Sequence, residues 1–127
     1  MKLLLDTHAF LWFVTGDRRL SRRGRRAAEA ADSELLISTA SVWEVAIKAS
    51  LGRLTLPKSV HDYFDDKVAA GFIILPVEWI HAARVAELPF HHRDPFDRLI
   101  IAQGLVESIP IVSGDPEFKK YGARIVW

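Results

Sequence analysis

Short apolar runs alternate along this chain with longer stretches of helical periodicity. Runs of three or four apolar residues bounded by turn-forming residues are typical of parallel strands that are buried on both faces. The clearest run is Met1 to Asp6, which holds three consecutive leucines. We expect five strands, at residues 1–6, 34–37, 72–75, 109–112 and 124–127.

The segments between these runs carry helix signals. Val42, Val45, Ala46 and Ala49 repeat at the i, i+3, i+4, i+7 spacing of one helix face, and Gly52 follows as a stop. Strands separated by helices predict right-handed crossovers, and therefore an α/β fold with a mainly parallel sheet and helices on both faces. We expect helices at residues 7–14, at 21–31 with Ser21 as the N-cap, from the cap-rich stretch 38–41 to 52, at 59–70, 77–88 and 94–107, and a short one opening at 114–116.

The composition matches one ordinary cytoplasmic domain. The chain has 127 residues, of which 50% are hydrophobic, and we expect a single domain over residues 1–127 with an ample core. The absence of cysteine excludes disulfides and thiolate metal sites. No apolar run approaches the roughly 18 residues that a membrane-spanning helix needs, so we expect no membrane segment and a cytoplasmic location.

Two aspartates fall where the first and fourth predicted strands end. Asp6 closes the first strand, and Asp115 follows the fourth after Ser113 and Gly114. Parallel strands bring their carboxyl ends to one edge of the sheet, where ligands bind in open α/β folds. The two carboxylates therefore meet if these strands are neighbours. For Asp6 alone, the alternative is that it caps the helix that starts at Thr7.

The predicted helix at residues 94–107 brings two further carboxylates. Asp94 fits the N-cap position, with proline at the first helical position. Asp97 stands three and four residues before Ile100 and Ile101, so it heads an apolar stripe and should point toward the sheet. Asp97 is the better site candidate, and Asp94 is the second.

Glu44 is the remaining candidate acid. It stands three residues after Ser41, the spacing of a capping box, and four residues before Lys48, a spacing that favours a helical ion pair. Either contact explains Glu44 as a structural residue. On the helix surface Glu44 also lies next to the apolar positions Ile47 and Leu51. It therefore borders a largely buried surface, where a functional role is the alternative.

Convergence of several acids at one sheet edge requires a compensating charge. Two carboxylates about 4 Å apart repel by roughly 4 kcal/mol at an effective dielectric constant near 20. Protonation or a cation relieves this repulsion, and hard oxygen ligands with room for water suit Mg²⁺ or Mn²⁺. The sequence therefore predicts a divalent-metal site. Its acids are Asp6, Glu44, Asp97 and Asp115.

Positive charge is concentrated in one segment, although the net charge is only +1. Six arginines fall between Arg18 and Arg26, and guanidinium groups bind phosphate oxygens through a fork of donors. Such a cluster can attract an anionic chain. The alternative is a solvated helix face with Leu20 and Ala28 turned inward. The candidate contact residues are Arg22, Arg23, Arg25 and Arg26.

Four short motifs, spread over the whole chain, carry a family resemblance. They are LLLDTH at residues 3–8, SVWEV at 41–45, HRDPFDRLIIAQ at 92–103 and SGD at 113–115. Their combination resembles the PIN-domain ribonucleases, and most of all the VapC toxins of VapBC toxin–antitoxin pairs. The resemblance implies a five-stranded parallel sheet in the order 3-2-1-4-5, Mg²⁺-dependent cleavage of RNA with Mn²⁺ as a substitute, a homodimer, and inhibition by a VapB-like antitoxin.

The resemblance also implies roles for individual side chains. A bound metal shields the phosphodiester charge and lowers the pKa of a water, and the acids position that metal. The family usually has threonine where this chain has Ser113, which keeps the hydroxyl. Thr7 and Ser113 either orient the carboxylates or act as turn and cap residues. The expected metal ligands are Asp6, Asp97 and Asp115, with Glu44 as water-orienting base or second-metal ligand and Asp94 as accessory acid.

The histidine pair and the tryptophans receive less specific expectations. Adjacent side chains in a loop seldom point the same way, so for His91 and His92 RNA contact or exposure is favoured over metal binding with Asp94. The tryptophans lie within apolar patterns, which favours the core or an interface over base stacking. They are Trp12, Trp43, Trp79 and Trp127.

A catalytically silent α/β interaction module is the alternative to the enzyme. Each acid has a separate structural explanation, so the spacing alone does not exclude such a module. A phospho-receiver domain fits less well, because it needs an aspartate at the end of the third strand, where this chain has Pro76. Metal-dependent cleavage of RNA by the purified protein distinguishes the enzyme from the module.

Overall fold

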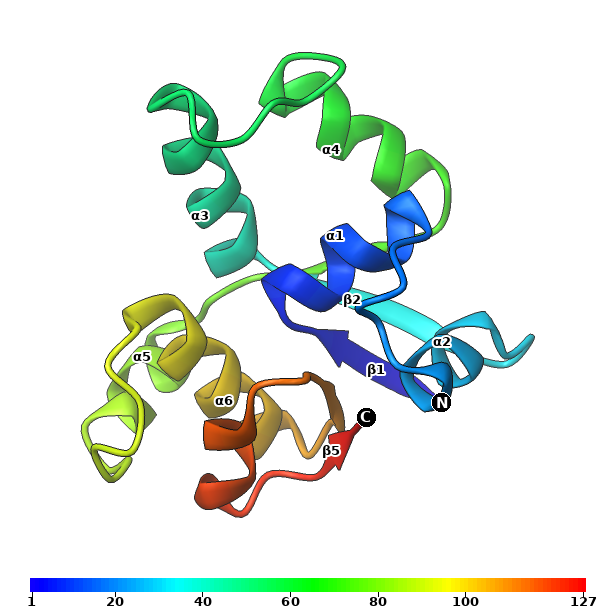
Figure 1. The fold of residues 1–127 in the computed structure, drawn as a ribbon. Coiled ribbons are helices and arrows are strands. Elements are labelled where there is room, and N and C mark those ends of the chain that lie inside the picture. The colour runs from blue at the N-terminus through cyan, green and yellow to red at the C-terminus, as the bar shows by residue number, and fades with distance from the viewer.

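One five-stranded sheet forms the centre of the molecule in the computed structural model, which describes residues 1–127 (Figure 1). Every strand pairing is parallel, and the strand order is β3-β2-β1-β4-β5. The predicted α/β sheet and the implied order are confirmed, and no antiparallel strand is present. The strands are β1 (Lys2–Leu5), β2 (Glu34–Ser38), β3 (Ile73–Leu75), β4 (Ile111–Val112) and β5 (Ile125–Val126).

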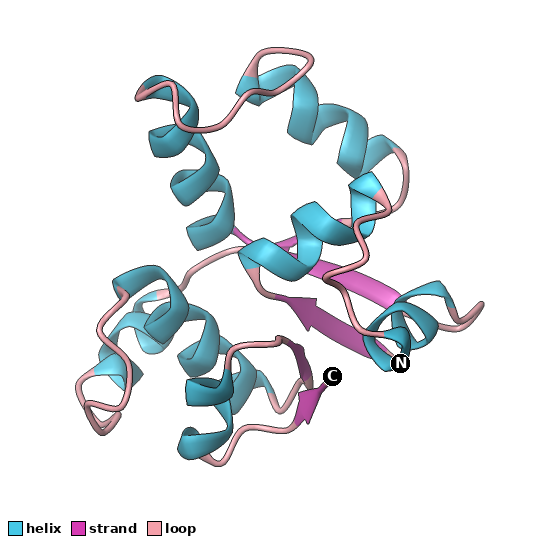
Figure 2. Ribbon diagram, viewed as in Figure 1, coloured by secondary structure: helices cyan, strands magenta, loops and turns pink.

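Helices lie on both faces of the sheet, as the sequence predicts (Figure 2). None of them combines the length and the apolar character that crossing a membrane requires. They are α1 (Thr7–Thr15), α2 (Arg22–Glu29), α3 (Thr39–Ser50), α4 (Val60–Ala69), α5 (Trp79–Val85), α6 (Pro95–Glu107) and the 3₁₀ helix η1 (Pro116–Tyr121).

Side-chain caps begin two of the helices at the predicted residues. Ser21 accepts a hydrogen bond from the Gly24 amide at 3.0 Å, which caps α2. Asp94 accepts from the Phe96 and Asp97 amides at 2.8 and 3.1 Å, which caps α6. These contacts satisfy amides that have no partner within the helix, so both N-cap predictions are confirmed.

The helix predicted at residues 77–88 is shorter in the structure, because α5 ends at Val85. The buried Arg98 of α6 donates to the Val85 carbonyl at 3.2 Å and to the Leu88 carbonyl at 3.3 Å. In a continuing helix the Val85 carbonyl would accept from the amide of residue 89, but Pro89 has no amide hydrogen. The proline therefore ends the helical segment, and the guanidinium group of Arg98 satisfies carbonyl groups left at that end.

The strand β1 sends alternate side chains into two separate cores. Leu3 and Leu5 face the core that includes Phe10 of α1, whereas Leu4 faces the core that includes Ile100 of α6. All three leucines are fully buried, as expected for a central parallel strand. Packing on both faces fixes β1, and with it the position of the acid that follows.

We expect Gly104→Ala to destabilise the fold, because α6 packs closely against β4. A Cβ atom at position 104 would lie 2.6 Å from Cδ1 of Ile111 and 3.2 Å from the Ile109 carbonyl oxygen. Overpacking costs about 1–3 kcal/mol, more than the roughly 1 kcal/mol that alanine gains over glycine in a helix. Urea denaturation should show a free energy of unfolding about 1–2 kcal/mol lower than that of the wild type.

Gly24→Ala in α2 is the matched control. Its added Cβ would meet Cδ1 of Leu20 at 3.2 Å, and this atom is the end of a side chain that can move. We expect the free energy of unfolding to stay within about 1 kcal/mol of the wild type. A Gly104→Ala protein as stable as this control would contradict the close approach of α6 and β4.

Candidate functional site

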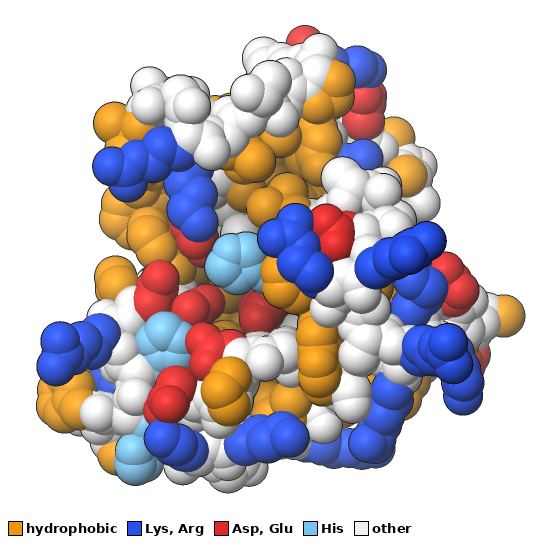
Figure 3. Space-filling model, viewed as in Figure 1, with side chains coloured by type: hydrophobic (Ala, Val, Ile, Leu, Met, Phe, Trp, Pro, Cys, Tyr) orange, Lys and Arg blue, Asp and Glu red, His pale blue; other side chains and the backbone are white.

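The candidate acids come together at the carboxyl edge of the sheet. The neighbouring strands β1 and β4 end side by side, and the Asp6 amide donates to the Val112 carbonyl at 3.1 Å. Asp115 follows β4, the first turn of α6 brings Asp97, and α3 brings Glu44. Figure 3 shows acidic and histidine side chains gathered in a hollow that α1, α3 and α6 surround. Part of this hollow is a cleft of about 370 Å³, whose lining includes Asp6, Asp97, Asp115, His8 and Arg19.

Asp6 is both a helix cap and part of the cleft lining. Its carboxylate accepts a hydrogen bond from the Ala9 amide at 2.7 Å, which caps α1. Burial raises the pKa of Asp6, while the Ser113 hydroxyl and the Ala9 amide oppose that shift. The structural and the functional explanations therefore hold together, because the cap fixes the carboxylate that lines the cleft.

Glu44 is held at both of its carboxylate oxygens. The Thr7 hydroxyl donates to Oε1 at 2.8 Å and shares a second hydrogen bond of 2.8 Å with the Ser41 hydroxyl. Lys48 donates to Oε2 at 2.8 Å, so the predicted ion pair is confirmed. The capping-box explanation is wrong, because the N-cap of α3 is Ser38 and Ser41 lies inside the helix.

Asp97 has a strongly raised pKa. It begins the stripe that continues with the fully buried Ile100 and Ile101, but its own side chain reaches the cleft and is 21% exposed. Its pKa is raised to about 8, first by burial and then by repulsion from the neighbouring acids. The repelling groups are, in decreasing order, Asp94, Asp6, Glu44 and Asp115.

Asp115 is oriented by the main chain around it. Its Oδ1 accepts a hydrogen bond from the Glu117 amide at 2.9 Å, which caps η1. Its own amide donates to the Ser113 hydroxyl at 3.1 Å. Ser113 is fully buried and acts on Asp6 as well. This hydroxyl therefore serves as a turn residue and as a neighbour of two of the acids.

His92 lies inside the site, which the sequence did not predict. Its side chain is only 15% exposed, and Nε2 lies 2.7 Å from Oδ2 of Asp115 and 3.2 Å from Oδ2 of Asp97. The expectation of an exposed side chain is therefore wrong for His92, although His91 is exposed. The only local feature of the sequence that relates His92 to the site is its position two residues before the N-cap Asp94, whose amide donates to Nδ1 of His92.

The donor set suits a hard divalent cation. Ligand atoms of His92, Asp97 and Asp115 lie within 4.8 Å of one another. Mg²⁺ prefers oxygen ligands and keeps several water molecules, for which the cleft has room. A cation would also relieve the repulsion that raises the pKa of Asp97. The residues present therefore fit such an ion.

The arginine cluster reaches the cleft through a residue other than the four candidates. Arg19 lines the cleft, pairs with Asp17 at 2.8 Å and lies over the Trp12 ring at 5.1 Å. Arg25 is half-buried, and it donates to the Asp17 carbonyl at 3.1 Å. The other three candidates are exposed on α2 and do not line the cleft: Arg22, Arg23 and Arg26.

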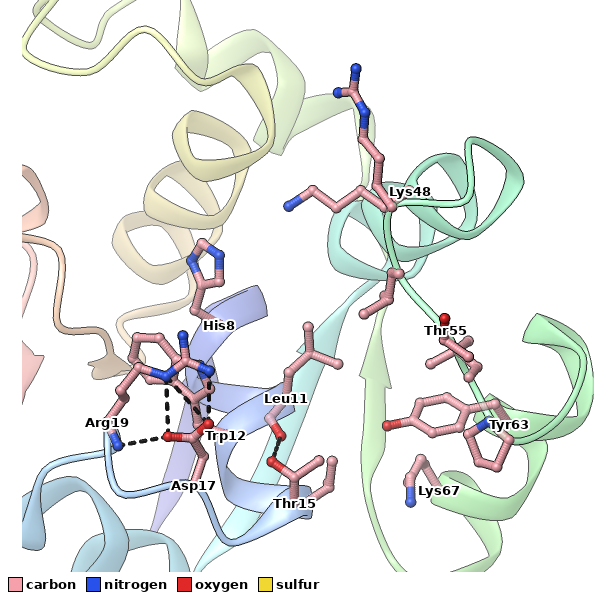
Figure 4. Close-up of a pocket in the computed structure, with 15 residues that line it drawn as sticks. His8, Leu11, Trp12, Thr15, Asp17, Arg19, Lys48, Thr55, Tyr63 and Lys67 are labelled. Carbon is pink, nitrogen blue, oxygen red and sulfur yellow. Dashed lines mark hydrogen bonds and ion pairs between the residues drawn. The ribbon is translucent and has the colours of Figure 1, made fainter.

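A larger pocket of about 690 Å³ adjoins the cleft (Figure 4). It lies between α1, the segment that connects α3 to α4, and α4 itself, and it shares His8, Trp12 and Arg19 with the cleft. The pocket therefore combines apolar walls with basic side chains. Its apolar lining includes Leu11, Leu54, Leu56 and Tyr63, and its basic lining includes Lys48, Arg53 and Lys67.

A known sequence family matches this chain, and solved structures share its fold. The sequence model described as PIN domain matches residues 3–124. The structure of VapBC2 from Rickettsia felis, bound to a DNA fragment from their promoter, is similar with a TM-score of 0.72 at 16% identity, over 98% of this chain and 97% of that chain. DNA-bound VapBC from Salmonella typhimurium is similar with a TM-score of 0.71 at 16% identity, over 98% of this chain and 96% of that chain. FitAcB from Neisseria gonorrhoeae is similar with a TM-score of 0.68 at 18% identity, over 97% of this chain and 95% of that chain. At these identities the likeness establishes the fold. No curated protein matches the sequence.

Proposed function

The chain belongs to the PIN-domain family, and we propose that it is a Mg²⁺-dependent ribonuclease, the VapC-like toxin of a toxin–antitoxin pair. The observation that carries this proposal is the convergence of several carboxylates in one cleft. Their mutual repulsion helps to raise the pKa of Asp97 to about 8, and a structural protein gains nothing from it. A nuclease needs such a group of acids to hold a cation beside a phosphodiester.

Each acid has a distinct part in the proposed mechanism. A bound divalent cation would shield the phosphate charge and lower the pKa of a water molecule. Asp6, Asp97 and Asp115 line the cleft and would hold the cation. Glu44 already has a hydrogen bond at each oxygen, so we assign it to orienting water. Thr7 fixes Glu44 in this position, while Asp94 caps α6 and so places Asp97.

The test of this function is cleavage of RNA by the purified chain. We expect cleavage in Mg²⁺ or Mn²⁺ and none in EDTA, because the acids cannot approach a phosphate without a compensating cation. Mapping the cleaved ends of transcripts after brief expression identifies the RNA. A protein that binds the metal and RNA but leaves RNA intact is the silent interaction module instead.

We propose that the four arginines of α2 contribute affinity for RNA without taking part in the chemistry. Replacing Arg22, Arg23, Arg25 and Arg26 with glutamine should weaken RNA binding and flatten its salt dependence. The slope of log K against log salt should decrease by about 0.7 for each arginine that contacts a phosphate. Cleavage at saturating RNA should stay near the wild-type rate.

Arg19→Gln is the matched comparison for these four arginines, because Arg19 lines the cleft. Binding and salt slope are measured by titration of labelled RNA at several salt concentrations. An unchanged slope in the fourfold variant rules out the RNA contact. A selective loss of antitoxin binding would place the arginines in the partner interface.

An antitoxin partner follows from the same proposal. Two similar structures are described as VapBC bound to DNA, and one as a toxin–antitoxin complex from Klebsiella pneumoniae. The pocket of Figure 4 offers an apolar floor with Lys48, Arg53 and Lys67 around it, which suits an amphipathic, acidic peptide. Such a peptide would also block access to the cleft, since Trp12 and Arg19 line both.

We also propose a homodimer. Large apolar side chains are exposed on α3 and α5, two helices that both pack against α6: Trp43 is 61% exposed and Trp79 is 80% exposed. A core position is therefore wrong for both tryptophans, and the predicted interface remains. The Trp43 ring meets the Phe96 ring edge-on at 5.3 Å, which extends the apolar surface onto α6. We propose that these exposed aromatic side chains form the contact between two copies of the chain, and sedimentation of the purified chain tests the dimer.

A further inference from the structure

The imidazole of His92 is fixed between two acids of the candidate site. Nε2 lies 2.7 Å from Oδ2 of Asp115 and 3.2 Å from Oδ2 of Asp97. The His92 amide donates to the Tyr121 hydroxyl oxygen at 2.6 Å, and the Phe118 ring meets the imidazole edge-on at 6.0 Å. Main-chain and ring contacts thus hold the side chain in one orientation.

The hydrogen bond at Nδ1 determines what the other ring nitrogen can do. The Asp94 amide donates to Nδ1 at 3.1 Å, so Nδ1 is an acceptor and carries no hydrogen. A neutral imidazole then carries its hydrogen on Nε2, which donates to Asp115. A ring nitrogen that bears a hydrogen has no free lone pair for a metal ion.

The same hydrogen bond immobilises the carboxylate of Asp115. Its Oδ1 accepts from the Glu117 amide at 2.9 Å and its Oδ2 accepts from His92 at 2.7 Å. Rotation of this carboxylate would break one of the two bonds. The remaining lone pairs of the Asp115 oxygens therefore point in a fixed direction. A carboxylate that binds a cation needs such a fixed orientation.

We propose that His92 is a positioning residue, which orients Asp115 for a divalent cation through its Nε2–H group and is not itself a metal ligand. The inference rests on the proposed metal-dependent function, because it concerns the same carboxylates. Hydrogen-bond partners of metal-binding carboxylates typically contribute 10–100-fold to metal affinity. His92 therefore lies within 4.8 Å of Asp97 and Asp115 because it holds a carboxylate ligand in place, and not because it binds the cation.

The first test is calorimetric titration of the RNA-free protein with Mg²⁺ and, separately, with Zn²⁺. His92→Leu should lower the affinity for both ions by the same factor, about 10–100-fold. His92→Gln should restore most of it, because the glutamine amide nitrogen can donate near the position of Nε2. His91→Leu, in the same loop but exposed, is the control and should match the wild type.

Several calorimetric results would overturn the proposal. An imidazole ligand matters far more to Zn²⁺ than to Mg²⁺, so a loss confined to Zn²⁺ would make His92 a ligand. Unchanged or increased affinity in His92→Leu, or no recovery in His92→Gln, would also overturn it. Thermal melting of each variant without metal separates these effects from unfolding.

The second test follows the Nε2 hydrogen directly by ¹⁵N-edited NMR of the imidazole rings. His81 provides an internal reference, because its Nδ1 accepts from the Glu78 amide at 2.9 Å and its Nε2 lies 2.9 Å from Glu107. The Nε2–H signals of His81 and His92 should both persist when Mg²⁺ or Zn²⁺ is added. Loss of the His92 signal alone would identify a ligand and refute the positioning role.

These measurements separate the role of His92 from the function of the chain. Both use the protein without RNA, so a protein that shows the expected metal affinities but cleaves no RNA counts against the ribonuclease alone. If the chain cleaves RNA but His92→Leu binds metal as tightly as the wild type, only the positioning role is contradicted. A wild-type protein that binds neither ion contradicts both.

Discussion

Asp97→Asn should lower the rate of RNA cleavage by roughly a thousandfold while the protein stays folded. Asparagine keeps the shape of the side chain but removes the charge that would hold the cation. The cation supplies several kcal/mol of transition-state stabilisation, and about 4 kcal/mol corresponds to a factor of roughly 10³ in rate. Single-turnover cleavage of labelled RNA at saturating Mg²⁺ measures this loss.

Asp6→Asn should cause a loss of similar size. Asparagine caps helices about as well as aspartate, so the contact with the Ala9 amide that begins α1 is kept and the fold should survive. The control is Asp65→Asn, which removes an exposed acid of α4 outside the cleft. It should cleave RNA at the wild-type rate. Full activity in both the Asp6 and Asp97 variants would remove the proposed site.

In metal-free buffer, the free energy of unfolding should fall as the pH rises from about 5 to about 8. The pKa of Asp97 is about 8 in the folded protein, compared with about 3.9 in an unfolded chain. In this range the folded protein therefore keeps a proton that the unfolded chain has lost. Stability then decreases with pH, by roughly 3 kcal/mol over the whole range for this one group.

Asp97→Asn should reduce that pH dependence by the contribution of this one group, because asparagine does not titrate. Urea denaturation of both proteins in EDTA at several pH values gives the difference, and parallel curves would contradict the raised pKa. Burial also raises the pKa of Asp6, so a slope of the same sign remains in the variant. Near pH 8, Mg²⁺ should raise the melting temperature of the wild type more than that of Asp97→Asn.

The acids expected at the site and the acids found there agree because the sheet is parallel. Asp6 and Asp115 each follow an apolar run, and parallel strands place such residues at one edge whatever their separation in the sequence. Glu44 was harder to judge, because its spacing to Lys48 predicts an ion pair that does form. The hydrogen bond from Thr7, 37 residues away, is what brings Glu44 to the site.

The sequence by itself determined the layers, the parallel sheet, the caps of α2 and α6, and the acids at the sheet edge. These features follow from hydrophobic period, turn chemistry and capping, all of which act between residues close together in the chain. The strand β1 is an example, because its three leucines are buried as the apolar run predicts.

Only the tertiary structure decided which groups neutralise, cap or orient one another. His92 meets Asp115 across 23 residues, and Arg98 donates to the Val85 carbonyl from 13 residues further along the chain. The pKa of Asp97 is set by burial and by acids from several elements. Burial and Coulomb repulsion depend on distance in space, and local spacing does not encode that distance.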